Sequence, residues 1–180
     1  PVTGTGESIQ KYASGALRPA WEDTKLPYSQ LWHYKWDRTY DALWNLAQVD
    51  SSPFDDVAME YSDPATGGSV LATMACWIQL IRPGIHTRAH RHTTSAVYQV
   101  FEGEGYSIID GQRFDWSPGD LFVVPSWSWH EFGNDSSQEA ILFSIQDNPV
   151  IKSLALFREE AYEENAGHQS VTGKFSGLQR

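Results

Sequence analysis

Short apolar segments separated by turn signals recur about every ten residues between Ser69 and Gln146, and this spacing constrains the fold more than any other feature. Asp110-Gly111 is a strong two-residue hairpin signal, because both residues tolerate a positive φ. Strands are expected over residues 71–82, 96–101, 106–109, 112–116, 121–124, 129–132 and 140–146. Short strands joined by tight turns predict an all-β fold, either an antiparallel sandwich or a small barrel.

The segments on either side of this β series follow a different pattern. Residues 37–48 fit an amphipathic helix with Asp37 as its N-cap and Leu43 and Trp44 on its apolar face. Residues 149–163 are also expected to be helical. The expected organisation is therefore an aromatic-rich arm and linker with a short helix over 1–60, a barrel over 61–148, and a C-terminal helix and tail over 149–180.

The arm is unusually aromatic between Tyr28 and Tyr40. The five rings in this stretch are Tyr28, Trp32, Tyr34, Trp36 and Tyr40. That many rings would form a large apolar patch in contact with water. We therefore expect the arm to be buried against this barrel or against another chain.

Composition and charge exclude several classes of function. The chain has 180 residues, of which 41% are apolar, the size and content of one domain with its own core. No apolar run reaches the roughly 18 residues of a membrane-spanning helix, and no signal segment opens the chain. A formal net charge of −10 argues against binding to nucleic acid or to an anionic membrane surface. The single cysteine, Cys76, cannot form an internal disulfide, which fits a cytoplasmic location.

Three histidines form a candidate metal site. Side chains alternate along a strand, so His90 and His92 lie on one face, close enough to share an ion. His86 and Arg88 fall on the same face if the strand is regular there. A third ligand must come from elsewhere in the fold, and His130 follows two hairpins later. Imidazole nitrogens suit Fe, Mn, Zn, Ni or Cu, and three protein ligands leave coordination positions open for catalysis.

Two spaced motifs around these histidines carry a family resemblance. They read Gly84-x5-His90-x-His92 and Gly119-x5-Pro125-x4-His130-x3-Asn134. They resemble the two motifs of the cupin family, whose jelly-roll barrel holds a metal ion inside. Cupins usually carry a glutamate ligand four or five residues after the second histidine, whereas here these positions are Ala96 and Val97. The resemblance therefore implies three neutral ligands, and an uncancelled 2+ charge favours a chelating anion together with a small ligand such as O2.

Four longer sequence strings make the family resemblance more specific. They are DPATGG at 63–68, HRHTTSA at 90–96, FDW at 114–116 and VPSWSWHE at 124–131. Together they resemble the gentisate-type ring-cleaving dioxygenases, which include gentisate, salicylate and 1-hydroxy-2-naphthoate dioxygenases. These are bicupins, with Fe(II) held by three histidines in the N-terminal barrel. This chain is similar to their C-terminal half, which often lacks a working site, and the resemblance leaves open that an N-terminal cupin domain is missing.

The resemblance carries over unevenly to individual site residues. Gln79 matches the family's substrate-facing glutamine on the strand before the first motif. The position of the arginine that grips the substrate carboxylate is Tyr98, and the position of a second catalytic histidine is Phe132. Thr94 replaces a glutamine two residues after the His-x-His pair. Arg88 either takes the place of the missing arginine or pairs with a carboxylate at the barrel mouth.

Two functions from different classes follow from this resemblance. The first is Fe(II)-dependent ring cleavage in aromatic catabolism, with an aromatic hydroxy acid and O2 as partners. Other divalent metals stay open, because three histidines accept several of them. The alternative is a non-catalytic second barrel that serves folding and oligomer assembly of a bicupin dioxygenase. A homo-oligomer, dimer or tetramer, is expected. A small sugar-binding or isomerase cupin is disfavoured by the missing glutamate.

Overall fold

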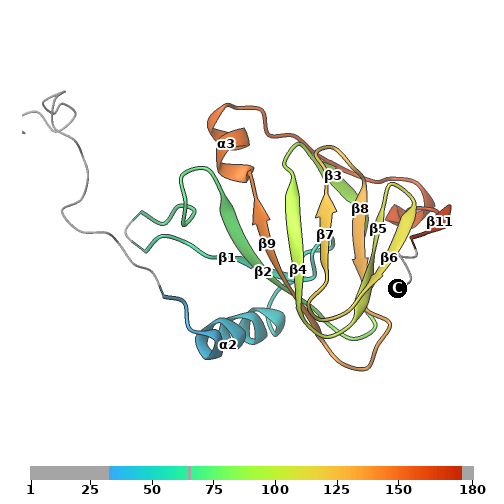
Figure 1. Ribbon diagram of the computed structural model, residues 1–180, viewed down its shortest axis with the longest axis horizontal. Coiled ribbons are helices and arrows are strands. Elements are labelled where there is room, and N and C mark those ends of the chain that lie inside the picture. Colours follow the sequence, from blue (N-terminus) through green and yellow to red (C-terminus); the bar gives the residue numbers. More distant parts are fainter. Residues whose placement is uncertain (1–32, 65, 176–180) are drawn as a thin grey trace, which may run out of the picture. The chain divides into compact units, whose positions relative to one another are not determined.

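Two facing β-sheets form the body of the protein, which confirms the expected all-β class (Figure 1). The computed structural model describes residues 33–64 and 66–175. The first sheet has the strand order β1-β2-β9-β4-β7 and is antiparallel throughout. Its strands are β1 (Val57–Glu60), β2 (Ala75–Ile81), β4 (Ala96–Glu102), β7 (Leu121–Val124) and β9 (Ala140–Gln146).

The second sheet has the order β10-β3-β8-β5-β6-β11. Its strands are β3 (His90–His92), β5 (Gly105–Ile109), β6 (Gln112–Trp116), β8 (His130–Gly133), β10 (Glu159–Ala161) and β11 (Gly173–Lys174). All neighbours are antiparallel except β11 and β6. The predicted hairpin turn is confirmed, since Asp110 and Gly111 have φ values of 46° and 77° between β5 and β6.

An apolar core fills the space between the two sheets. Its buried members come from both sheets and are Ile81, Ala96, Tyr98, Val100, Ile109, Trp116, Val124, Phe132, Ala140 and Leu142. Alternation along β4 shows the division clearly, because Ala96, Tyr98 and Val100 are buried while Val97 is exposed. The interior of the barrel is therefore packed with side chains.

The predicted helix near residue 40 is present as α2 (Trp36–Ala47). Its Leu43 is fully buried against Val57, Leu80 and Ile141 of the first sheet. The helix begins one residue earlier than expected, with Lys35 in place of Asp37 at the N-cap. Asp37 lies in the first turn, where a carboxylate interacts favourably with the helix dipole. No helix in the described ranges is long and apolar enough to cross a membrane.

The aromatic side chains of the arm contact the barrel but keep part of their surface in water. Trp36 packs on Phe101 with ring centroids 4.6 Å apart, and it is 37% exposed. The Tyr34 ring meets Tyr61 edge-on at 5.0 Å, and its hydroxyl donates to the Ser62 carbonyl at 2.6 Å. Burial of the arm by this barrel alone is therefore incomplete. Tyr28 and Trp32, which belong to the same prediction, lie outside the described residues.

The prediction of a long helix over residues 149–163 is wrong. Helix α3 (Asn148–Ser153) ends after six residues, and Ala155 then takes a left-handed φ of 56°. The chain returns to the barrel and forms β10, which pairs Glu160 with Arg91. Pairing with a distant strand has therefore overridden a helical sequence pattern, as tertiary context commonly does.

An ion pair fixes the loop between α2 and β1 to the barrel. Asp56 is 2% exposed and has a left-handed φ of 58°. Its carboxylate accepts the Arg82 backbone N–H at 2.8 Å and the Arg82 Nε at 3.0 Å. Ser52 and Asp56 also exchange backbone hydrogen bonds. We call the loop that they enclose, residues 52–56, the mouth loop. It is therefore held against Arg82, the residue that directly follows β2.

Replacement of Arg82 by leucine should destabilise the protein by about 2–4 kcal/mol, because it leaves the buried Asp56 carboxylate without its counter-charge. Urea unfolding followed by tryptophan fluorescence measures this change. The exposed Arg158, changed in the same way, is the matched control and should cost much less. Equal stability of the two variants would contradict this role for the ion pair.

Candidate metal centre

Alternation along β3 separates its three side chains as the sequence pattern predicts. His90 and His92 point into the barrel, and Arg91 points out. Outside, the Arg91 guanidinium lies between two indole rings, 4.6 Å from the centre of Trp127 and 4.2 Å from that of Trp129. Its Nη2 also lies 2.7 Å from the Glu160 carboxylate of β10. These outer contacts fix the strand, and with it the direction of the two histidines.

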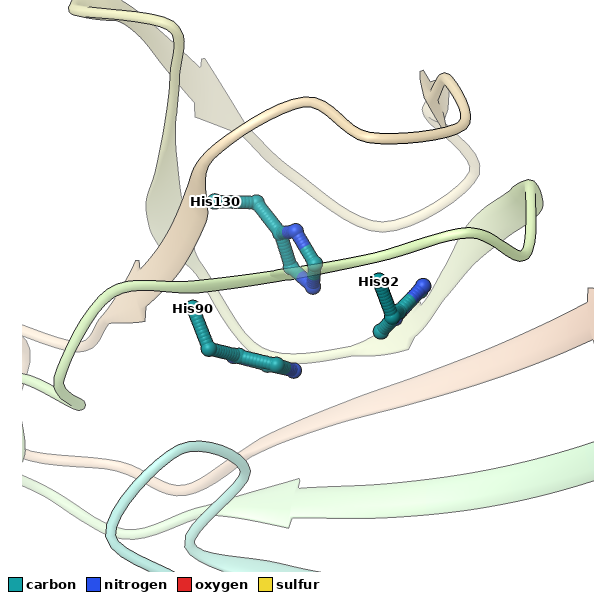
Figure 2. Close-up of side chains that lie close together, drawn as sticks. All are labelled: His90, His92 and His130. Atoms are coloured by element: carbon teal, nitrogen blue, oxygen red, sulfur yellow. The ribbon is translucent and has the colours of Figure 1, made fainter. Parts of the chain in front are cut away.

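The third histidine comes from the neighbouring strand. His130 begins β8 and pairs directly with His90 of β3. The imidazole centroids are 4.2 Å apart for His90 and His130, 4.8 Å for His92 and His130, and 5.4 Å for His90 and His92. One ligand atom from each ring lies within 4.8 Å of the others. Figure 2 shows the three rings turned toward one another. The structure thus brings the three predicted histidines together.

Hydrogen bonds orient two of these rings and leave ring nitrogens unused. His92 Nδ1 lies 3.0 Å from the Thr94 carbonyl oxygen, and His130 Nδ1 lies 3.0 Å from that of Ser128. A ring that donates from Nδ1 presents the lone pair of Nε2, the usual arrangement in metal-binding histidines. His130 Nε2 and His90 Nδ1 are buried and have no hydrogen-bond partner. Buried polar atoms without partners are rare, and a metal ion would satisfy them.

The environment also keeps the three imidazoles neutral. Burial lowers the pKa of His90 to about 2, with smaller contributions from the neighbouring His130 and His92. Burial likewise lowers the pKa of His130 to about 3 and lowers that of His92. A neutral imidazole is the form that binds metals, because protonation occupies the donor lone pair. The cluster is therefore ready to act as a set of ligands at neutral pH.

The mouth loop adds residues to the site that the sequence pattern did not indicate. Its Phe54 ring lies 4.9 Å from the His90 ring. The side-chain amide of Gln79, buried on β2, donates to the Asp55 carbonyl oxygen at 2.8 Å. Burial raises the pKa of the Asp55 carboxyl to about 6, and the Ser52 hydroxyl partly offsets this rise. The sequence predicts this loop only as part of the arm, because no motif marks it, and therefore does not indicate Phe54 and Asp55 as site residues.

Behind the histidines the barrel interior is apolar and aromatic. Tyr98 is buried, stacks on Phe122 at 5.0 Å and lies 5.3 Å from Phe132. Burial raises the pKa of the Tyr98 hydroxyl, so it stays protonated. Phe132 in turn lies 5.9 Å from the His130 ring. Among the buried residues of the described chain there is no lysine or arginine.

The expectation that Arg88 shares a face with His90 is wrong. The segment before His90 is not a regular strand: the Arg88 N–H donates to the Pro53 carbonyl, and the Ala89 N–H donates to that of Gly167. Ala89 and His90 are consecutive and both buried, whereas Arg88 is exposed. Alternation is therefore interrupted, and the Arg88 side chain does not reach the histidine cluster from the inner face.

Comparisons with known proteins agree with this architecture. A sequence profile described as a cupin domain matches residues 77–146. The chain is similar to a 5-aminosalicylate 1,2-dioxygenase of Comamonas sp., with 42% identity over 92% of this chain and 45% of the relative. It is also similar to a 1-hydroxy-2-naphthoate 1,2-dioxygenase of Nocardioides sp., with 34% identity over 80% of this chain and 37% of the relative.

A solved structure gives the same picture. The salicylate 1,2-dioxygenase of Pseudoaminobacter salicylatoxidans superposes with a TM-score of 0.69 and 28% identity, over 86% of this chain and 43% of that protein. The chain thus spans less than half the length of each of these relatives. Two facing sheets, three inward histidines and these likenesses lead to one assignment: the chain carries a cupin domain and resembles one half of the ring-cleaving dioxygenases of the gentisate and salicylate type.

Proposed function

We propose that this barrel is the metal-holding C-terminal half of an Fe(II)-dependent dioxygenase that uses O2 to cleave the ring of hydroxylated aromatic carboxylates. The observation that carries the proposal is the cluster of His90, His92 and His130, with its unpartnered buried ring nitrogens. Dioxygenases of aminosalicylate and hydroxynaphthoate are among the relatives, which supports the substrate class. The competent catalyst in this proposal is a longer bicupin chain located in the cytoplasm.

The donor set fits a first-row divalent metal. Three imidazole nitrogens suit Fe(II), and they also accept Mn, Zn or Ni. Because all three donors are neutral, they leave the positive charge of a divalent ion uncancelled and favour an anionic ligand such as a carboxylate. When bound at these histidines, Fe(II) supplies the redox chemistry with O2, which no side chain provides.

The chain's own residues have positioning and proton-holding roles in this proposal. The Thr94 and Ser128 carbonyls hold the rings of His92 and His130. Phe54 covers His90 and excludes water from that side. Asp55, with its raised pKa, is able to take up a proton near neutral pH, such as the one released by a phenolic hydroxyl on binding.

This barrel offers only weak interactions for binding the substrate carboxylate. A buried arginine would bind a carboxylate through charge-assisted, bidentate hydrogen bonds. Tyr98 offers one neutral hydroxyl in its place, and its hydrogen bond to a carboxylate is weaker by about 1–2 kcal/mol. Phe132 offers no proton-handling group. These two residues support the view that this half alone is a poor catalyst.

A second candidate function is a non-catalytic barrel that serves folding and oligomer assembly. Besides Tyr98 and Phe132, the outer face of the first sheet supports it. Val97 pairs with Val123 on one side and Ile145 on the other, and the three side chains are 45%, 54% and 40% exposed. Exposed apolar rows of this kind mark contact surfaces between proteins. In this reading the histidines are retained as a structural metal site within a homo-oligomer.

Replacement of His92 by alanine should remove one equivalent of bound Fe(II), because two imidazoles hold an ion much less tightly than three. Anaerobic equilibrium dialysis against Fe(II) measures the loss. The exposed His33, replaced by alanine, is the control and should leave binding unchanged. Unchanged binding in both variants would exclude the histidine cluster as the iron site.

The isolated 180-residue chain, loaded with Fe(II), should turn over gentisate at least about 100-fold more slowly than a full-length bicupin relative. The reason is that Tyr98 and Phe132 supply neither a cationic grip nor a proton-handling imidazole. Oxygen uptake in the presence of gentisate measures the rate. Fast ring cleavage that disappears in His130→Ala would overturn this expectation and make this half the catalytic one.

The raised pKa of Asp55 should make the metal-free protein less stable as the pH rises from about 4 to about 6. Over this range the native state retains a proton that the unfolded chain has released, so the free energy of unfolding falls with pH. Asp55→Asn should remove this dependence, a relative gain of about 1–3 kcal/mol at pH 7. Urea unfolding at several pH values measures it, with the exposed Asp41→Asn as control. Parallel pH curves for the wild type and Asp55→Asn would contradict the raised pKa.

A further inference from the structure

A second group of side chains that could hold a metal ion lies on the other side of β8 from the three-histidine site. It consists of His86, Glu131 and His168, and we call it the outer cluster. Glu131 follows His130 directly, so strand alternation turns its side chain away from the barrel interior. His86 precedes β3, and His168 follows the short helix η1 (Asn165–Gly167) in the C-terminal segment.

The distances within the outer cluster suit a shared ion. His168 Nδ1 lies 3.3 Å from Glu131 Oε2, and His86 Nε2 lies 3.7 Å from Glu131 Oε1. The two imidazole centroids are 4.3 Å apart. Two atoms bound at about 2.1 Å to one tetrahedral ion lie roughly 3.4 Å from each other. The separation of 3.7 Å is too long for a hydrogen bond, whereas it is close to that of two ligands of one metal.

The buried Glu131 carboxylate needs a nearby positive charge to offset the cost of its burial. The side chain is 0% exposed, and a buried carboxylate is costly unless it is paired. In the described ranges its ion-pair partners are His86 and His168, and no lysine or arginine forms an ion pair with it. The Gln169 backbone N–H donates to Glu131 Oε1 at 3.1 Å, which orients the carboxylate without supplying a full charge. A divalent cation would supply that charge.

We propose that His86, Glu131 and His168 bind a divalent transition-metal ion of the zinc type, independently of the three-histidine site. Two imidazole nitrogens and one carboxylate are a ligand set that Zn²⁺ and its neighbours accept, with a further position for water. The histidine side chains are 36% and 30% exposed, so an ion can enter from solvent. The Gln169 N–H acts as the outer partner that such ligating carboxylates commonly have.

The site would fasten the C-terminal segment to the barrel. The Ala89 N–H already donates a hydrogen bond to the Gly167 carbonyl oxygen at 2.7 Å. The Gln169 side chain accepts the Gly111 N–H at 3.0 Å and donates to the Ile108 carbonyl at 2.8 Å. A metal bound by His168 from this segment and by His86 and Glu131 from the barrel would cross-link the two. The proposed role is therefore structural, and it does not depend on ring-cleavage activity.

The experiment uses Zn²⁺ alone as the probe and a background in which the inner site is disabled. Chelator-treated His92→Ala protein is dialysed against Zn²⁺, and bound zinc is measured by elemental analysis. We expect one equivalent to remain bound. Adding His168→Gln or His86→Ala should weaken this binding at least about 10-fold. Adding His33→Ala, which removes an exposed histidine outside both clusters, should leave it unchanged.

Hydrogen exchange gives a second readout that does not depend on stoichiometry. In the His92→Ala background, Zn²⁺ should slow amide exchange over residues 165–169, and His168→Gln should abolish this effect. His86 and His168 are partly exposed, so their replacement leaves the core intact, which circular dichroism checks. Loss of all zinc in His92→Ala, or zinc binding that survives both His168→Gln and His86→Ala, would overturn the proposal. Either result leaves the assignment of the inner site untouched.

Discussion

Side-chain alternation along β8 is the constraint on which both candidate metal sites depend. His130 pairs with His90 across the sheet and points into the barrel, and Glu131, one residue later, points out. Phe132 returns to the interior core. A shift of one residue in the register of β8 would exchange these faces and place a carboxylate among apolar side chains. The apolar core between the sheets therefore fixes the register, and the register places the ligands.

The same core sets the chemistry available to the inner histidines. Desolvation lowers the pKa of His90 and His130 because their buried surroundings contain few polar groups that could stabilise an imidazolium. The result is a cluster of three neutral imidazoles whose lone pairs are available to a metal ion. Tyr98, which stacks on Phe122 in this environment, also stands at the position where the family resemblance leads us to expect an arginine that binds the substrate carboxylate. The metal ligation that we propose and the weak substrate binding that we expect of this half would thus have one physical origin, the dense packing of the barrel interior.

The sequence predicted those elements whose signals are local. The strands at 112–116, 121–124 and 140–146 and the turn at Asp110-Gly111 were found because alternation and turn chemistry act over a few residues. The convergence of His90, His92 and His130 followed from alternation and motif spacing. The predictions that failed concern segments whose structure depends on contacts with residues far away in the sequence. Strand β10 exists because it pairs with β3, and the mouth loop is held by Arg82, far along the chain. No local pattern encodes either contact.

The separation of His86 from His90 illustrates how a single backbone irregularity divides potential metal ligands between two clusters. In a regular strand His86 and His90 would share a face. Arg88 and Ala89 instead donate their N–H groups to the mouth loop and to Gly167, and alternation is interrupted just before β3 begins. His86 consequently lies beside Glu131 outside the barrel, whereas His90 lies beside His130 inside. The backbone contacts of two residues, which bind no ion themselves, separate one run of potential ligands into two chemically different clusters.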